Sequence, residues 1–441
     1  LDSGSVIEPN LSEDGKTVYF SYFHNADDKT FQSKLPKLWA DLYSINLSPI
    51  LANNSLDPAM LIAKRLTFAN VVENNELVTD QLYKDALNPE LKSNGSHNWG
   101  TVYMHPEEMR TKYGLKLIYV SDKKRISNSN RSMNYANHNF NLYIADVTED
   151  GSLKNHQQFQ YYTTTSALSP NRLRNGIAFS YQGTTEDARH WQIQGLTSSG
   201  QWYPIFGYGR NPESVHLSTF CVKEKGNHPG DYLVATSYYN QNNNGFGALH
   251  SVMLSMAGLN GYDLPEGGAI VPRQLGAKQL TKGVEVQDLP AVKINNKTLG
   301  KFTTPRCGKA DQLYFSHTPT SANERVTDSD SNRGFYRAYI GYRNNLEPFD
   351  ATKNVNLATE VGVAKVIEDA TGERNLLWPL PVLSWQARTG DVEQTYTAPA
   401  VASQTQITAG MPFAEVGTSA LWNTDRRPFD CWLGSKGRTP F

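Results

Sequence analysis

A unit made of a turn, a strand and a second strand recurs along this chain, and no other feature of the sequence limits the fold as strongly. In the first copy, residues 11–22 read Leu-Ser-Glu-Asp-Gly-Lys-Thr-Val-Tyr-Phe-Ser-Tyr. The Asp-Gly turn leads into β-branched and aromatic residues, which favour a strand. Residues 41–47, Asp-Leu-Tyr-Ser-Ile-Asn-Leu, then alternate with period two. Further copies occupy 115–122 with 141–147, 168–171 and 176–181 with 191–196, 231–238 with 248–254, and 311–317 with 335–342, and a degenerate copy lies in 375–385.

Units of this kind stack most simply as the four-stranded blades of a β-propeller, because radial repetition leaves only short, protected sheet edges. Six units predict an all-β, six-bladed propeller. The spacers 48–96 and 255–300 exceed hairpin loops and predict long inter-strand insertions. Helical periodicity is scarce, with short candidates at 57–64 and 106–113. The innermost strands are predicted at Val18–Ser21, Ile177–Ser180, Leu233–Thr236 and Leu313–Ser316.

The repeats assign residues 1–400 to the propeller and residues 401–441 to a closing or linker segment that leads to a further module. Either residues 1–9 or the segment 400–441 completes the last blade in this interpretation. The chain has no initiator Met and stops at Gly-Arg-Thr-Pro-Phe. We therefore expect it to be one portion of a longer polypeptide.

The charges nearly cancel, with 42 Lys and Arg against 43 Asp and Glu and a formal net charge of -1. Nucleic acids and anionic membranes demand a basic excess, so neither is expected as the main partner. No apolar run approaches the ~18 residues of a membrane span, so no transmembrane segment is expected. Abundant Asn, Ser, Thr and Tyr favour an exported bacterial protein. We expect a periplasmic or extracellular location, after removal of an export signal that this sequence does not contain.

The first unit resembles the PD40, or WD40-like, propeller repeat of bacterial exported proteins. In that repeat Ser-Pro-Asp-Gly precedes the innermost strand. Residues 11–15 match it well, and Leu168-Ser-Pro-Asn171 matches it in part. This resemblance supports the fold far better than it supports a function.

Three further phrases look like the propeller region of proteins similar to the alpha subunit of hydrazine synthase: Met104–Met109, Asn139–Ala145 and Thr304–Gly308. The resemblance implies a bacterial extracytoplasmic redox protein whose propeller precedes domains that carry c-type haem. Covalent haem attachment needs Cys-x-x-Cys-His, and no cysteine here has a second one at that spacing. We expect no covalent haem within this chain, and the implied partner is a protein module or subunit that bears the haem.

A calcium site is predicted at Asp328-Ser-Asp330-Ser-Asn332-Arg-Gly334. Three oxygen-bearing side chains alternate in a loop, and the glycine allows the sharp bend around a hard cation. The twelfth position, where an EF-hand has a bidentate Glu, is Tyr339. The alternative is a solvated turn between two strands of the fifth blade.

The three cysteines are too few for a disulfide scaffold, and we expect three free thiols. Cys307 lies six residues before Leu313, in the turn that enters an innermost strand. It is a candidate soft-metal ligand together with His317, and the alternative is a small buried side chain. Cys221 and Cys307 are expected on the same side of the propeller, and Cys431 elsewhere.

The sequence contains no Gly-x-Ser-x-Gly elbow, zinc-hydrolase spacing or phosphate-binding glycine loop. Residues 123–135 are either a recognition loop for carboxylates or a surface insertion. The leading hypothesis is an exported scaffold or docking domain associated with an extracytoplasmic c-type cytochrome or redox module. The second is a free-standing extracellular binding or structural assembly protein. The third is an enzyme with a site in the propeller channel, although no convergent acid, base or metal groups emerge from the spacing.

Overall fold

The chain folds as two compact units. The first comprises residues 1–187, 196–202 and 385–441, and the second comprises 188–195 and 203–384. The computed structural model describes residues 4–24, 40–53, 57–68, 101–111, 113–123, 140–158, 166–173, 176–184, 189–197, 202–206, 215–223, 232–239, 245–254, 278–282, 293–294, 297–298, 300–308, 312–318, 338–343, 349–350, 363–369 and 375–382.

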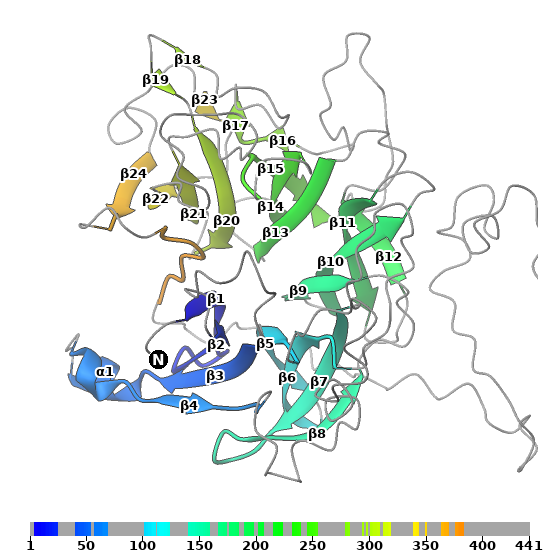
Figure 1. Ribbon diagram of the computed structural model, residues 1–441, viewed down its shortest axis with the longest axis vertical. Helices are drawn as coiled ribbons and strands as arrows, with labels where there is room; N and C mark the ends of the chain where they lie inside the picture. Colours follow the sequence, from blue (N-terminus) through cyan, green and yellow to red (C-terminus); the bar gives the residue numbers. More distant parts are fainter. Residues whose placement is uncertain are drawn as a thin grey trace, which may run out of the picture. The chain divides into compact units, whose positions relative to one another are not determined.

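Two complete antiparallel sheets of four strands belong to the first unit, and both follow the chain order (Figure 1). The first contains β1 (Ser5–Leu11), β2 (Thr17–Phe23), β3 (Ala40–Asn46) and β4 (Ala63–Arg65). The second contains β5 (Tyr103–Thr111), β6 (Gly114–Ser121), β7 (Asn141–Val147) and β8 (Leu153–Gln158). A short helix α1 (Ser48–Asn53) and a 3-10 turn η2 (Pro58–Met60) lie between β3 and β4.

A third sheet has the strand order β12-β11-β10-β9. Its strands are β9 (Ala167–Leu173), β10 (Gly176–Thr184), β11 (Arg189–Thr197) and β12 (Trp202–Phe206). The strands β9 and β10 fall in the first unit, whereas β11 and β12 each have residues in both.

The second unit holds two further four-stranded sheets. One contains β13 (Val215–Lys223), β14 (Tyr232–Tyr239), β15 (Ala248–Met253) and β16 (Lys278–Gln279). The other contains β20 (Lys301–Cys307), β21 (Leu313–Thr318), β22 (Tyr339–Arg343) and β24 (Val363–Ile367). Two small sheets pair β17 (Thr281–Lys282) with β23 (Phe349–Asp350) and β18 (Lys293–Ile294) with β19 (Lys297–Thr298). The five four-stranded meanders are the blades of a β-propeller.

The strand β6 shows why the blades of the first unit stack. Successive side chains of a strand point to opposite faces of the sheet. Leu117 and Tyr119 join one buried cluster, with Tyr19, Leu42, Leu66, Tyr103, Tyr143, Ala145 and Leu153. Ile118 and Val120 join another, with Ala40, Val102, Met104, Met109, Leu142, Ile144, Ala167, Ile177, Phe179, Tyr181 and Leu196. The second blade is therefore buried on both faces, against side chains of the first blade and of the third.

The first strand of every blade carries a β-bulge at the same place. The pairing with the second strand shifts between Ile7 and Asn10, Met104 and Glu107, Leu168 and Asn171, Leu217 and Phe220, and Thr303 and Arg306. Four of these bulges contain a proline, in Glu8-Pro9, His105-Pro106, Ser169-Pro170 and Thr304-Pro305. The residue before each proline is left-handed, with φ between 47° and 54°. Proline lacks an N–H and is tolerated in a sheet at an edge or a bulge, so the dipeptide suits this position.

In each unit, a Leu-Thr dipeptide forms hydrogen bonds with the third strand of a blade. In the first unit, the N–H of Leu42 in β3 donates to the Thr67 hydroxyl at 3.0 Å, and the N–H of Leu66 donates back to the Leu42 carbonyl. In the second unit, the N–H of Leu249 in β15 donates to the Thr281 hydroxyl, also at 3.0 Å. The leucine buries its side chain while the threonine completes the hydrogen bonds of the third strand.

The predicted all-β propeller is confirmed, but the predicted number of six blades is wrong. The described residues form five four-stranded sheets. The expected sixth unit, residues 375–385, shows no strand in its described part, 375–382. Two prolines in that stretch, Pro379 and Pro381, remove backbone donors that a sheet ladder needs.

Two other predictions also need correction. The strands predicted to be innermost lie in β2, β10, β14 and β21, which are second in their sheets. The first strands contact one another instead, β5 with β1 and β9 in the first unit and β13 with β20 in the second. The predicted helix at 106–113 is wrong, because Pro106–Thr111 belongs to β5.

Within the described ranges, no helix is both long and apolar enough to cross a membrane.

Candidate functional site

The bulges of the first unit bring three polar side chains together from three blades, and we call Glu8, His105 and Ser169 the bulge cluster. The Ser169 hydroxyl donates to Glu8 Oε2 at 3.0 Å, and His105 Nε2 lies 3.2 Å from the same oxygen. The backbone N–H of Ser169 donates to His105 Nδ1 at 3.1 Å. All three residues are buried. Hydrogen bonds to Glu8 meet the cost of burying its carboxylate, so the cluster joins the blades.

These contacts decide which nitrogen of His105 carries the proton. Nδ1 faces a backbone N–H and must accept, so a neutral ring is protonated at Nε2. That Nε2–H then donates to the Glu8 carboxylate. A histidine held in this way offers no lone pair from Nε2 to a metal, and we assign it as a hydrogen-bond donor in the joint between blades.

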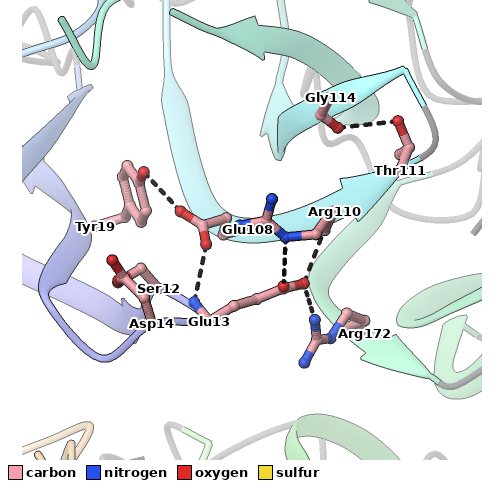
Figure 2. Close-up of polar contacts among 9 residues, drawn as sticks. All are labelled: Ser12, Glu13, Asp14, Tyr19, Glu108, Arg110, Thr111, Gly114 and Arg172. Atoms are coloured by element: carbon pink, nitrogen blue, oxygen red, sulfur yellow. Dashed lines mark hydrogen bonds and ion pairs between the residues drawn. The ribbon is translucent and has the colours of Figure 1, made fainter. Parts of the chain in front are cut away.

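A second group lies at the end of β1 and β5, and we call Glu13, Glu108, Arg110, Arg172 and Tyr19 the carboxylate–arginine cluster (Figure 2). Glu108 of β5 is 5 % exposed and points toward the first blade. Its Oε1 accepts the backbone N–H of Glu13 at 2.8 Å, and its Oε2 accepts the Tyr19 hydroxyl at 2.8 Å. Both oxygens of Glu108 are therefore engaged by the neighbouring blade.

The Glu13 carboxylate in this cluster contacts two arginines from two other blades (Figure 2). The Arg110 backbone N–H donates to Glu13 Oε1 at 3.1 Å, and Arg110 Nε lies 3.3 Å from Glu13 Oε2. The Arg172 guanidinium, from β9, also contacts Oε1. Three blades thus meet at one carboxylate, and charge-assisted hydrogen bonds of this kind are stronger than neutral ones.

Burial changes the proton affinity of this cluster. Desolvation raises the pKa of Glu108 to about 7, although the hydrogen bond from Tyr19 opposes that rise. Burial and the nearby Glu108 charge raise the pKa of Tyr19 above its ordinary value. Burial would also raise the pKa of Asp14, but hydrogen bonds from Ser12 and from the Lys16 N–H give a net lowering. Glu108 therefore changes charge near neutral pH.

In the second unit a disulfide joins two first strands. Cys221 of β13 and Cys307 of β20 are bonded, with their Cα atoms 5.7 Å apart. The prediction that these cysteines lie on the same side is confirmed, and the prediction of three free thiols is wrong. The facing β13 and β20 strands bring the two Cα atoms within the ~7 Å that a disulfide requires. Cys307 in this form has no thiolate to offer the predicted soft-metal site.

The bulge of β20 repeats the contact seen in the first unit. The Thr304 hydroxyl lies 2.8 Å from the Ser316 hydroxyl and accepts the backbone N–H of Trp378 at 3.1 Å. The N–H of Ser169 makes the equivalent bond to His105. Trp378 is also left-handed and also precedes a proline. The residue before proline therefore uses its side chain in the same way in both units, as an acceptor for the next segment.

The remaining sequence predictions fall largely outside the described residues. Asp328, Asp330, Asn332 and Gly334 lie there, so the calcium loop stays a prediction, as does the segment 401–441. Of the predicted recognition loop only Lys123 is described. Within the described part of the chain, no three His, Cys, Asp or Glu side chains gather as a metal site would need.

Sequence reasoning missed both clusters of the first unit. One signal was available: a polar residue followed by proline recurs at Glu8, His105, Ser169 and Thr304, always a few residues before a predicted strand. Two of the phrases that resemble hydrazine synthase alpha subunit-like proteins, Met104–Met109 and Thr304–Gly308, contain such a dipeptide. The dipeptide of a polar residue and proline marks the bulged first strands. The contacts that these strands make could not be predicted from the sequence.

Comparison with known proteins gives only distant structural likenesses. No family model matches the chain, and no curated protein matches it. Among solved structures, the chain is similar to the GH93 α-L-arabinofuranosidase of Fusarium graminearum, with 12 % identity and a TM-score of 0.35 over 71 % of this chain and 74 % of that one. The chain is also similar to an α-L-arabinofuranosidase from Lactobacillus brevis, with 13 % identity and a TM-score of 0.32 over 54 % of this chain and 68 % of that one. A luciferin-regenerating enzyme has 10 % identity and a TM-score of 0.32 over 77 % of this chain and 91 % of that one. Likenesses this low carry no argument about this chain.

Proposed function

We propose that this chain is an exported β-propeller that serves as a rigid scaffold on which a partner protein module docks. The observation that carries the proposal is the way the polar groups of the first strands are used. Glu8, Glu13 and Glu108 each bind a neighbouring blade, and Ser169 and Arg172 supply the opposite groups. Bonds of this kind tie the blades of the first unit together, and a scaffold needs such stiffness.

The disulfide supports the location. Disulfides persist in oxidising compartments and are rare in the cytosol, where thiol systems keep cysteines reduced. Cys221 and Cys307 are paired across two blades, which fits a periplasmic or extracellular protein. The abundance of Asn, Ser, Thr and Tyr supports the same proposal independently.

The partner is proposed from the resemblance in the sequence. Proteins similar to the alpha subunit of hydrazine synthase combine a propeller with domains that carry c-type haem. The phrases that carry this resemblance lie in β5, around β7 and in β20. We therefore propose a haem-bearing redox module or subunit as the docked partner. The chain itself supplies the platform and no covalent haem ligand.

The test is native purification of the tagged chain from the extracytoplasmic fraction of its host, followed by size exclusion with visible spectra and intact mass. A Soret band that co-elutes with the 49.2 kDa chain but belongs to a separate mass supports the scaffold. The matched variant Cys221→Ser/Cys307→Ser tests whether docking of the partner requires the disulfide between the blades. A colourless species of 49.2 kDa alone contradicts the redox partner and favours a free-standing binding or structural protein.

An enzymatic role is the second candidate, and Glu108 is the observation in its favour. A buried carboxyl with a pKa of about 7 beside a tyrosine hydroxyl is poised to give or take a proton at neutral pH. Glu108→Gln keeps the shape and removes this chemistry. If an activity is found, loss of kcat with unchanged fold in this variant supports the role, and unchanged kcat contradicts it.

Calcium remains a separate proposal for Asp328, Asp330 and Asn332. Bound calcium stabilises the folded state by linkage, about 2.7 kcal/mol at a hundredfold excess over Kd. Adding a chelator should therefore lower Tm in the natural chain and leave Tm unchanged in Asp328→Asn/Asp330→Asn. An equal Tm for the natural chain with and without chelator contradicts the site.

A further inference from the structure

Three tyrosine rings contact one another in a row across the second blade, and we call Tyr103, Tyr119 and Tyr143 the tyrosine ladder. They come from β5, β6 and β7, the first three strands of the sheet. The ring centroids of Tyr103 and Tyr119 lie 5.9 Å apart, and those of Tyr119 and Tyr143 lie 5.6 Å apart. All three are buried, with Tyr119 0 % exposed. Aromatic rings at this spacing are in contact.

The central tyrosine has a base at its hydroxyl. Tyr119 Oη lies 2.8 Å from Nδ1 of His156, which belongs to β8, the fourth strand of the same blade. Lys123 Nζ lies 3.5 Å from the same oxygen and 4.2 Å from the centre of the Tyr143 ring. An ammonium group only donates, so the Tyr119 oxygen accepts from Lys123 and directs its own proton to His156. Burial and the Lys123 charge lower the pKa of His156 to about 4, which leaves the ring neutral and able to accept.

Considered alone, Tyr119 would be an ordinary buried phenol with one satisfied hydrogen bond. The ladder adds a path, because rings in contact run from the first strand of the blade to the third, and the proton acceptor lies on the fourth. A phenol loses an electron more easily when its proton can move to a neighbouring base in the same step. The blade holds both parts, a proton acceptor and a chain of oxidisable rings.

We propose that Tyr119 is a site of one-electron oxidation, with His156 as the proton acceptor and the tyrosine ladder as the route for the electron. The oxidant is an outer-sphere one-electron acceptor of high potential, such as a metal complex. Tyr119 gives one electron to the oxidant, its O–H bond breaks, and the proton forms a bond with His156 Nδ1. The products are a neutral tyrosyl radical, a protonated imidazole and the oxidant reduced by one electron. This inference does not rest on the proposed scaffold function.

The charge of Lys123 gives the proposal a distinctive signature. Moving a proton onto His156 places a second positive charge close to the ammonium group, which opposes the step. Lys123→Met removes that opposition and should raise the yield of the radical. A tyrosine that plays only a packing role would show no such response.

The experiment is flash oxidation of the full chain with photogenerated tris(bipyridine)ruthenium(III), followed by transient absorption and freeze-quench EPR. We expect a long-lived tyrosyl radical in the natural chain, loss of its long-lived component in Tyr119→Phe and a several-fold smaller yield in His156→Gln. The rate should fall in D2O for the natural chain and not for His156→Gln. Tyr113→Phe, in the same blade but 63 % exposed, is the matched control and should leave the long-lived signal intact.

A site-specific label keeps the test decisive if Tyr119→Phe does not fold. Incorporating 3-fluorotyrosine at position 119 should change the hyperfine pattern of the long-lived radical. A chain without a long-lived radical overturns the proposal. An unchanged signal in folded Tyr119→Phe, or an unchanged hyperfine pattern with the label, overturns it equally.

Discussion

Glu108 shows at the scale of one residue how a single carboxyl can link two blades and sense pH. It accepts one hydrogen bond from the backbone of Glu13 and one from Tyr19, yet burial still keeps its pKa near 7. Desolvation therefore outweighs the hydrogen bond from Tyr19 at this position. The protein carries an acid that is partly protonated at neutral pH inside the joint between its first and second blades.

This joint predicts a definite pH dependence. The folded pKa of Glu108 lies above its unfolded value, so the folded state binds more protons and its contribution to stability falls as pH rises from about 4.5 to about 7. The upper bound is about 3.4 kcal/mol, since the pKa rises from 4.5 to about 7 and one pKa unit corresponds to about 1.4 kcal/mol. Glu108→Gln has no such titration. Urea unfolding of both proteins at several pH values should give free energies that differ by a pH-dependent amount across this window.

The natural chain must be compared with Glu108→Gln because the titration of two histidines changes stability with pH in the opposite direction. Burial lowers the pKa of both His156 and His250 to about 4, so their contributions are lost as pH falls from about 6.5 toward 4. Both histidines are present in the natural chain and in Glu108→Gln, and their effects cancel in the difference. Parallel stability curves for the two proteins would contradict the assignment to Glu108.

At the residue scale the sequence predicted little of the site. The Asp14-Gly15 turn was evident from its composition, and Gly15 is left-handed as such a turn requires. Glu13 and Glu108 are 95 residues apart in the chain, and nothing in either neighbourhood announces that they meet. Contacts between blades depend on the bulges and on the sheet register, which a single sequence does not specify.

At the scale of elements, two glycines mark places where the backbone needs a left-handed conformation. Gly300 precedes β20 with φ 72°, and Gly151 lies in the turn between β7 and β8 with φ 76°. A Cβ on Gly300 would collide with the backbone carbonyl of Thr318, whereas a Cβ on Gly151 has nothing within 4 Å. A substitution at Gly151 therefore introduces conformational strain alone, whereas a substitution at Gly300 adds steric overlap.

These glycines give a paired prediction. Gly151→Ala should cost about 1 kcal/mol, the strain of a left-handed alanine. Gly300→Ala should cost several kcal/mol more, because Thr318 belongs to the strand that pairs with β20 and its carbonyl cannot move away freely. Chemical unfolding of both variants measures the difference. Equal losses would mean that β20 and β21 can shift apart.

The strands themselves were predicted better than their order within the blades. The alternating runs 41–47 and 141–147 correspond to β3 (Ala40–Asn46) and β7 (Asn141–Val147). The first strands were missed because the bulge adds one residue and breaks the period of two. Around His105-Pro106 that interruption even imitated a helix.

At the scale of the whole molecule, the sequence predicted the propeller but not its blade count. Residues 375–385 are apolar and aromatic enough to imitate another unit, yet Pro379 and Pro381 deprive the stretch of ladder donors. The disulfide was missed for a different reason. Cys221 and Cys307 are separated by 86 residues and meet only because β13 and β20 are the facing strands of two blades.

The disulfide leads to a prediction about stability. By the chain-entropy estimate, closing a loop of this length should stabilise the fold by about 4.6 kcal/mol. Reduction should lower the unfolding midpoint of the natural chain, whereas Cys221→Ser/Cys307→Ser should start lower and not respond to the reductant. Thiol counting in denaturant without reductant should give one of the three cysteines. A count of three, or equal stability with and without reductant, would contradict the bond.

The proline bulges have a consequence for how the protein behaves in a crowded solution. The first strand of every blade is the edge of its sheet. An edge strand with a regular row of free N–H and C=O groups invites pairing with another chain and hence aggregation. Four of the five edges contain a proline and a left-handed residue in mid-strand, which interrupt that row. The same dipeptides that aim side chains at neighbouring blades therefore make these four edges poor templates for an incoming strand, and protect those blades whenever they are exposed during folding.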